Sequence, residues 1–270
     1  MLGVTHAYPR EKALKFRAID IYFFQGGDPR TSAFLFFAFL DTPTNNNREG
    51  EEKDTYLCHI SLSYPHRAGF LGRDEPIEVP SSSTERLALM KEISQDWADP
   101  FKSIIQDLPD NAEPKRLSIE DWAPGMEGRE WDNLGGRVTL VGDSAGAMTM
   151  YRGEAYNHGI LSTQTLLKNL LPILQSPTFI SDPFSIPSST ALATAISTYE
   201  SELIARTRPA VLASRAACRD AHDYERIGEK SPLVARRIEN LAIEEDEGIV
   251  KWVEHQGESL KEGPEVAIEA

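Results

Sequence analysis

Cysteine is scarce in this chain, because Cys58 and Cys218 are the only two among 270 residues. A disulfide framework is therefore excluded as the scaffold of the fold. Long apolar stretches are also missing: the longest apolar run, Ala33 to Leu40, has the length of a strand and falls far short of the roughly 18 residues of a membrane helix. The N-terminus carries no basic segment followed by an apolar stretch. We therefore expect no membrane span and a reducing, cytoplasmic location.

Basic residues are in deficit. The chain has 28 Lys and Arg against 42 Asp and Glu, which gives a formal net charge of −14. The phosphates of a nucleic acid or of an anionic membrane would be repelled by this charge, so neither is expected as a partner. The acid is partly concentrated in residues 239–270, for which we predict an acidic helix or a loose tail.

Two glycine patterns are missing as well. No G-x-G triplet and no Asp-Gly dipeptide occurs in the sequence. The Gly-rich turn that holds a pyrophosphate at the start of a Rossmann unit is therefore not found in these 270 residues. The length and the hydrophobic share of 40% are nevertheless sufficient for a sizeable core. We expect a folded chain without a complete dinucleotide site of this type.

Residues 1–120 carry the signals of a sheet with helices. Three segments are rich in aromatic and β-branched residues and are predicted as strands: 16–24, 32–40 and 55–64. Ser82, with Glu85 three residues later, has the form of a capping box and predicts a helix start. A second short helix is predicted after Asp99-Pro100, and a short strand over 116–119. Together they predict an antiparallel sheet with covering helices.

Residues 121–238 have the order strand, loop, helix. An apolar segment of strand length, 137–141, leads into the loop Gly142 to Gly146, and a helix is predicted from Glu154 onward. The apolar side chains of that helix share one face: Ile160, Leu161, Leu166, Leu167, Leu170, Leu171 and Leu174. A long helix over 189–217 follows, with Pro209 inside it. The predicted fold class is α+β, with long C-terminal helices after the sheet.

The loop fits two different functions. Gly142-Asp143-Ser144-Ala145-Gly146 matches G-x-S-x-G, the strand-to-helix turn that presents a nucleophilic serine in esterases. Ser144 would then need an oxyanion loop of the H-G-G-G type and a histidine with an acid. No H-G-G-G segment precedes the loop, and among the later histidines the one considered as a triad partner is His222, which has Asp220 and Asp223 beside it. A serine esterase stays as the alternative function.

The second interpretation rests on a longer stretch. The run from Gly136 to His158 resembles the second flavin-contacting motif of class A FAD-dependent monooxygenases, the group that includes salicylate and p-hydroxybenzoate hydroxylases, and is most similar to fungal members. The likeness continues through Phe24 to Pro29 and Tyr199 to Arg206, and covers the chain up to about Arg237. The resemblance implies FAD as cofactor, NAD(P)H as reductant, and hydroxylation of an aromatic or polyketide-like small molecule.

The same motif predicts which residues would hold the flavin. A carboxylate in the loop, Asp143, can accept hydrogen bonds from the hydroxyls of a ribityl chain, and the first turn of the following helix offers unpaired N–H groups. The resemblance implies a cofactor-binding set: Gly142, Asp143, Gly153, Glu154, Ala155 and Asn157. Ala155 and Tyr156 stand where the family has Gly-Ala, so the flavin contact is expected to be reshaped. No catalytic acid or base and no metal site is assigned.

The missing G-x-G-x-x-G turn has a consequence within this resemblance. The chain is similar to the C-terminal part of such a monooxygenase and lacks the N-terminal segment that holds the pyrophosphate. We therefore expect it to be incomplete and inactive alone, with a second chain as the candidate supplier of the missing FAD half. A non-catalytic remnant that acts as an interaction module is the remaining alternative.

Overall fold

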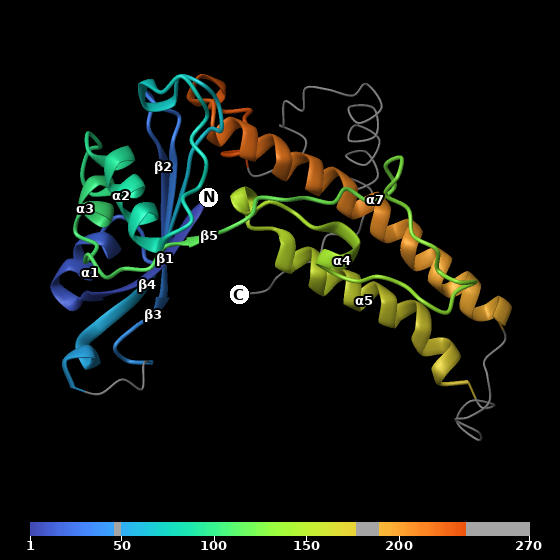
Figure 1. The fold of residues 1–270 in the computed structure, drawn as a ribbon. Coiled ribbons are helices and arrows are strands. Elements are labelled where there is room, and N and C mark those ends of the chain that lie inside the picture. Colours follow the sequence, from blue (N-terminus) through green and yellow to red (C-terminus); the bar gives the residue numbers. More distant parts are fainter. Residues whose placement is uncertain (46–49, 177–188, 236–270) are drawn as a thin grey trace. The chain divides into compact units, whose positions relative to one another are not determined.

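The computed structural model describes residues 1–45, 50–176 and 189–235 (Figure 1). These residues form two compact units. The first consists of Met1–Ile119 and Ala221–Arg226, and the second of Glu120–Asp220 and the described residues from Ile227 onward. The acidic helix or tail predicted for 239–270 lies outside the described residues.

The first unit is built on one five-stranded sheet in which all neighbouring strands are antiparallel. Its strands are, in spatial order, β2 (Phe23–Gly27), β3 (Phe34–Asp41), β4 (Thr55–Ser63), β1 (Leu2–Pro9) and β5 (Lys115–Arg116). The predicted strands 32–40 and 55–64 correspond to β3 and β4, which pair with each other. The antiparallel sheet and the mixture of helix and strand confirm the predicted α+β class.

The predicted strand over 16–24 is wrong. Arg10–Arg17 forms helix α1, and β2 begins only at Phe23. Ala13 and Phe16 lie three residues apart on one face of α1 and are both buried. Phe16, the first residue of the predicted strand, therefore enters the core from a helix. Strand β1 has no counterpart among the predicted strands, and the strand predicted over 116–119 is reduced to β5.

Two helices pack on one face of this sheet (Figure 1): α2 (Ser83–Ser94) and α3 (Phe101–Gln106). The predicted capping box is confirmed, because the Ser82 hydroxyl accepts the Glu85 N–H at 3.2 Å and the Glu85 carboxylate accepts the Ser82 N–H at 3.4 Å. Short 3-10 turns occupy Gly50–Asp54 and Phe70–Gly72. The core between sheet and helices contains Tyr8, Phe16, Phe37, Ile60, Met90, Ile93, Ile104 and Ile105.

The described part of the second unit contains helices and irregular segments. Its helices are α4 (Asp143–Gly146), α5 (Ala155–Leu174) and α7 (Ser189–Ala221), and a 3-10 turn lies at Met150–Arg152. The last residue of α7 belongs to the first unit, as does a further 3-10 turn, Tyr224–Arg226. Helices α5 and α7 lie side by side (Figure 1). Thr165 donates to the Glu202 carboxylate at 3.0 Å, and Arg206 donates to the Ser162 hydroxyl at 2.9 Å.

The predicted strand over 137–141 is also wrong. These residues form the end of a turn and an irregular segment, and the described part of the second unit offers no strand with which they could pair. Their polar groups bond to α7 instead: the Tyr199 hydroxyl donates to the Leu140 carbonyl at 2.7 Å, and the Thr139 hydroxyl to the Glu200 carboxylate at 2.8 Å. Asp143 therefore does not follow a strand.

Helix α5 presents its apolar stripe outward. Ile160, Leu161, Leu167, Leu171 and Leu174 are exposed, whereas its buried residues are Ser162 and Thr165. The predicted apolar face exists, but most of it points away from α7, which α5 meets through Leu166 and through the polar side chains of Ser162 and Thr165. None of the helices in the described ranges is long and apolar enough to cross a membrane.

Candidate functional site

A tight turn positions the loop in front of α4. Gly142 has φ 64° and ψ −139°, a backbone conformation that is open to glycine and strained for other residues. A Cβ atom on Gly159 would lie 3.9 Å from the Cα of Gly142, so the loop and the first half of α5 approach each other closely. This approach creates one side of a groove.

The groove has a volume of about 590 Å³. It is lined by Val141, Gly142, Asp143, Ala155, Tyr156, Gly159, Ile160 and Thr163. Three of the six predicted cofactor residues, Gly142, Asp143 and Ala155, thus come together in one place. Asp143 is exposed, and no hydrogen bond or ion pair engages its carboxylate within the described part of the chain. Its oxygens are free to accept hydrogen bonds from a ligand's hydroxyl groups.

The other three predicted residues do not line the groove. Gly153 has φ 65° and ends the 3-10 turn before α5. The Glu154 carboxylate is held by Arg152, with Nη2 to Oε1 at 2.8 Å and Nε to Oε2 at 3.1 Å. Arg152 also donates to the carbonyls of Pro232 and Ala235, so Glu154 belongs to a structural ion pair. The Asn157 side chain is exposed outside the groove.

The start of α5 adds a partial positive charge. Glu154 precedes the helix with helical backbone angles, and within the described ranges no side chain caps the first N–H groups. Unpaired N–H groups and the helix dipole favour a negatively charged or acceptor-bearing ligand at this end. The groove therefore places a hydrogen-bond-accepting carboxylate, Asp143, near the donor groups of the helix start.

The curated proteins similar to this chain carry one kind of name. The chain is 49% identical over 237 residues to a probable FAD-dependent monooxygenase of Arthroderma benhamiae, a match that covers 88% of this chain and 52% of the relative. It is 32% identical over 190 residues to FAD-dependent monooxygenase tazP of Aspergillus terreus, covering 70% and 45% of the two chains. FAD-dependent monooxygenase dbaB of Emericella nidulans is 34% identical over 176 residues, covering 65% and 42%.

These homologues are fungal FAD-dependent monooxygenases. The chain spans about half the length of the curated relatives it matches. No family model matches the chain.

Five groove residues, Val141 and four residues of α5, were not in the predicted cofactor-binding set. Tyr156, Gly159, Ile160 and Thr163 are spaced at i, i+3, i+4 and i+7 along α5, which places them on one face of the helix. That spacing is visible in the sequence and could have identified them as soon as Ala155 was assigned to the site. Tyr156 is 78% exposed, so its ring stands at the groove without covering it.

The esterase alternative finds no support in the geometry. The Ser144 hydroxyl donates to the Val141 carbonyl at 2.8 Å and accepts the Val141 N–H at 3.2 Å. His158 bonds instead with Arg206, and burial together with the Arg206 charge lowers the pKa of His158. Across the described ranges, no hydrogen bond joins Ser144 to a histidine. Its hydroxyl stabilises a turn.

Proposed function

We propose that this chain is the flavin-contacting part of a class A, salicylate hydroxylase-like FAD-dependent monooxygenase that acts on an aromatic or polyketide-like small molecule in the cytoplasm. The names of its homologues support FAD, monooxygenation and oxidoreductase chemistry. The observation that carries the site assignment is the groove shared by Gly142, Asp143 and Ala155. When bound, FAD reduced by NAD(P)H supplies the activation of O2, and the protein supplies position and electrostatics.

The residues of the groove fit the ribityl side of a flavin. Asp143 has a carboxylate free to accept hydrogen bonds from ribityl hydroxyls. Gly142 has no side chain between the loop and a ligand, and the uncapped start of α5 suits the electron-rich edge of the flavin ring. Ala155 and Tyr156 set how closely that ring approaches the helix. Gly153 and Glu154 belong to the turn that leads into α5, and Asn157 lies in the first turn of α5 outside the groove lining.

These contacts are too few for tight binding by the chain alone. A helix-end interaction contributes about 0.3–1 kcal/mol, and a hydrogen bond to a charged group about 1.5–3 kcal/mol. Micromolar affinity requires about 8 kcal/mol. The pyrophosphate contacts therefore have to come from polypeptide outside these 270 residues, supplied by a second chain or by a longer form of this one. The isolated chain is expected to purify colourless.

Co-expression tests this proposal. The chain is produced together with the part of the Arthroderma benhamiae relative that it does not match, and the purified complex is examined for flavin absorbance and NAD(P)H oxidation. We expect a yellow complex. Asp143→Ala should weaken FAD binding by roughly tenfold to a hundredfold, the loss of one charge-assisted hydrogen bond. Asp74→Ala, the same change at an exposed aspartate of the first unit, should leave the affinity unchanged.

Two results would contradict the proposal. If the isolated chain carries bound flavin from the column, its cofactor site is complete and the need for a second segment is refuted. If the complex binds FAD with the same affinity after Asp143→Ala, the groove is not the flavin site. A complex that never binds FAD would favour the non-catalytic interaction module.

A further inference from the structure

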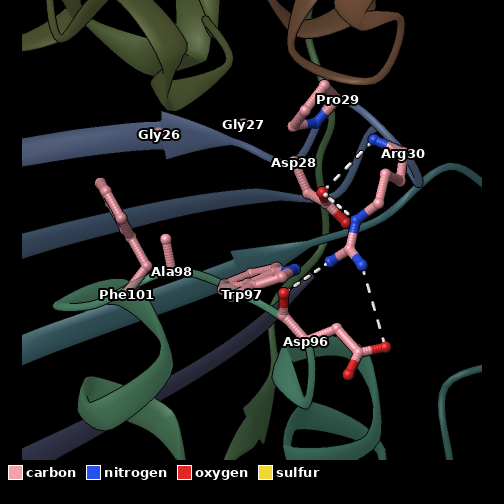
Figure 2. Close-up of a pocket in the computed structure, with 9 residues that line it drawn as sticks. All are labelled: Gly26, Gly27, Asp28, Pro29, Arg30, Asp96, Trp97, Ala98 and Phe101. Atoms are coloured by element: carbon pink, nitrogen blue, oxygen red, sulfur yellow. Dashed lines mark hydrogen bonds and ion pairs between the residues drawn. The ribbon is translucent and has the colours of Figure 1, made fainter.

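A cavity of about 370 Å³ opens at the end of β2 in the first unit (Figure 2). Its apolar walls are Gly26, Gly27, Pro29, Trp97, Ala98 and Phe101. The volume lies in the range of pockets that take small organic ligands. A Cβ atom on Gly26 would lie 2.7 Å from Cζ of Phe101, so the ring packs directly on the strand backbone. A side chain at position 26 would therefore force the Phe101 ring to move away from this wall.

Trp97 provides the polar group that needs a partner. The residue is only 9% exposed, and its buried Nε1 atom has no hydrogen-bond partner among the residues that the structure describes. A buried indole N–H usually donates a hydrogen bond, and leaving it unpaired is costly. In Figure 2 the nitrogen end of the indole points along the cavity toward Asp28 and Arg30. The cavity therefore has an apolar body and one unused donor at its polar end.

The charges at that end are paired with each other. Asp28 accepts from Nε of Arg30 at 3.3 Å and from the Thr31 hydroxyl at 2.7 Å. Arg30 also donates from Nη2 to the Asp96 carbonyl at 2.8 Å, and its Nη1 lies 3.8 Å from Asp96 Oδ2. Two carboxylates against one guanidinium leave a local charge of −1. An anionic ligand is disfavoured here, whereas a neutral oxygen acceptor is not.

We propose that this cavity binds a neutral, planar aromatic molecule whose phenolic or carbonyl oxygen accepts a hydrogen bond from Nε1 of Trp97. The ring lies against Phe101 and the indole, where apolar burial and aromatic contact stabilise it. The oxygen satisfies the unpaired donor. This site does not depend on the flavin groove, since every residue in it belongs to the first unit.

The test uses 1-naphthol as the neutral probe, with naphthalene and 1-naphthoate as comparators of the same ring system. Binding to the full 270-residue chain is measured by calorimetric titration without flavin. We expect saturable binding of 1-naphthol and at least about fivefold weaker binding of both comparators, which lack the oxygen or add a negative charge. Equal binding of naphthalene would refute the hydrogen bond.

Three variants locate the site. Trp97→Phe removes the donor and should weaken 1-naphthol by about fivefold. Ala98→Phe, at an exposed position on the cavity wall, should fill the space and abolish binding without relying on a core substitution. Trp122→Phe, the matched change in the second unit, should have no effect. The proposal is overturned if 1-naphthol shows no saturable binding, or if its binding is unchanged in both Trp97→Phe and Ala98→Phe. Neither variant should change FAD binding by the co-expressed complex.

Discussion

Nη1 of Arg206, on α7, lies 2.9 Å from Nδ1 of His158, on α5. A guanidinium can only donate hydrogen bonds, so Nδ1 must be the acceptor and His158 must be neutral, with its proton on Nε2. The same guanidinium donates from Nη2 to the Ser162 hydroxyl at 2.9 Å. One arginine therefore ties the two long helices together, and its bond to the His158 ring forms only while that ring is unprotonated.

This contact predicts a pH dependence of stability. Burial and the Arg206 charge lower the pKa of His158 below its ordinary value of 6.5, so the unfolded chain binds the proton more readily than the folded one. The contribution of His158 is complete above pH 6.5 and is lost as the pH falls below that value. His158→Asn keeps an oxygen acceptor that does not titrate. Urea unfolding at pH 7, 6 and 5 should show a shallower loss of stability in the variant.

Other histidines set the background of that experiment. Burial also lowers the pKa of His6 and of His59, so both proteins should still lose stability between pH 7 and 5. The difference between the two curves isolates His158. Parallel curves would show that its protonation costs nothing and that the bond to Arg206 does not stabilise the helix pair.

Adjacent glycines provide a second prediction. Gly136 has φ 84°, and a Cβ atom there would lie 2.5 Å from the backbone Cα of Ala193. Gly136→Ala combines backbone strain with a collision against α7, so we expect a loss of about 3–5 kcal/mol in the free energy of unfolding. Gly135 has φ 68° but open space around it, and Gly135→Ala should cost about 1–2 kcal/mol. Thermal melts of both variants measure the two losses of stability. Equal losses in Gly136→Ala and Gly135→Ala would show that α7 moves to make room for the methyl group.

Local sequence signals predicted the elements whose stabilising contacts are local or alternate regularly. The capping box of Ser82 and Glu85 involves groups three residues apart, and the alternation in 55–64 reflects two faces of one strand. The segment 137–141 has the same apolar character, but a strand also needs a neighbour to receive its backbone bonds. Tyr199, about 60 residues further on, donates to the backbone carbonyl of Leu140 instead, and Glu200 accepts the side-chain hydroxyl of Thr139.

The site shows the same limit. The resemblance of residues 136–158 to a flavin-contacting motif implied that Gly142, Asp143 and Ala155 belong together, and these three residues line one groove. The sequence could not show that Glu154 is held by Arg152, because the buried position of Arg152 depends on carbonyls of Pro232 and Ala235 far along the chain. Nor does the spacing of apolar residues in α5 reveal whether their face is covered.

The irregular segment depends on one carboxylate. Glu200 accepts hydrogen bonds from Trp131 Nε1 at 2.9 Å, from the Asn133 amide at 2.8 Å and from the Thr139 hydroxyl at 2.8 Å. Glu200→Ala leaves three donors without their acceptor, and we expect a loss of about 2–4 kcal/mol because water can replace part of the contacts. Glu202→Ala removes one hydrogen bond, from Thr165, and should lower the free energy of unfolding by about 1 kcal/mol at most. Urea unfolding of the two variants measures the difference; similar losses would refute the role of Glu200.

The turn around Ser144 leads to the last prediction. A serine nucleophile needs a histidine to remove its proton and donors for the oxyanion, whereas the Ser144 hydroxyl is bonded to both backbone groups of Val141. The protein should therefore hydrolyse p-nitrophenyl acetate no faster than Ser144→Ala does, and a fluorophosphonate probe should label neither, while a known serine esterase treated in parallel is labelled. Ser144→Ala should lose roughly 1 kcal/mol of stability, the worth of the turn bonds. Labelling that is present in the natural chain and disappears in Ser144→Ala would show that this loop is a nucleophile elbow after all, and would shift the function from flavin binding to ester hydrolysis.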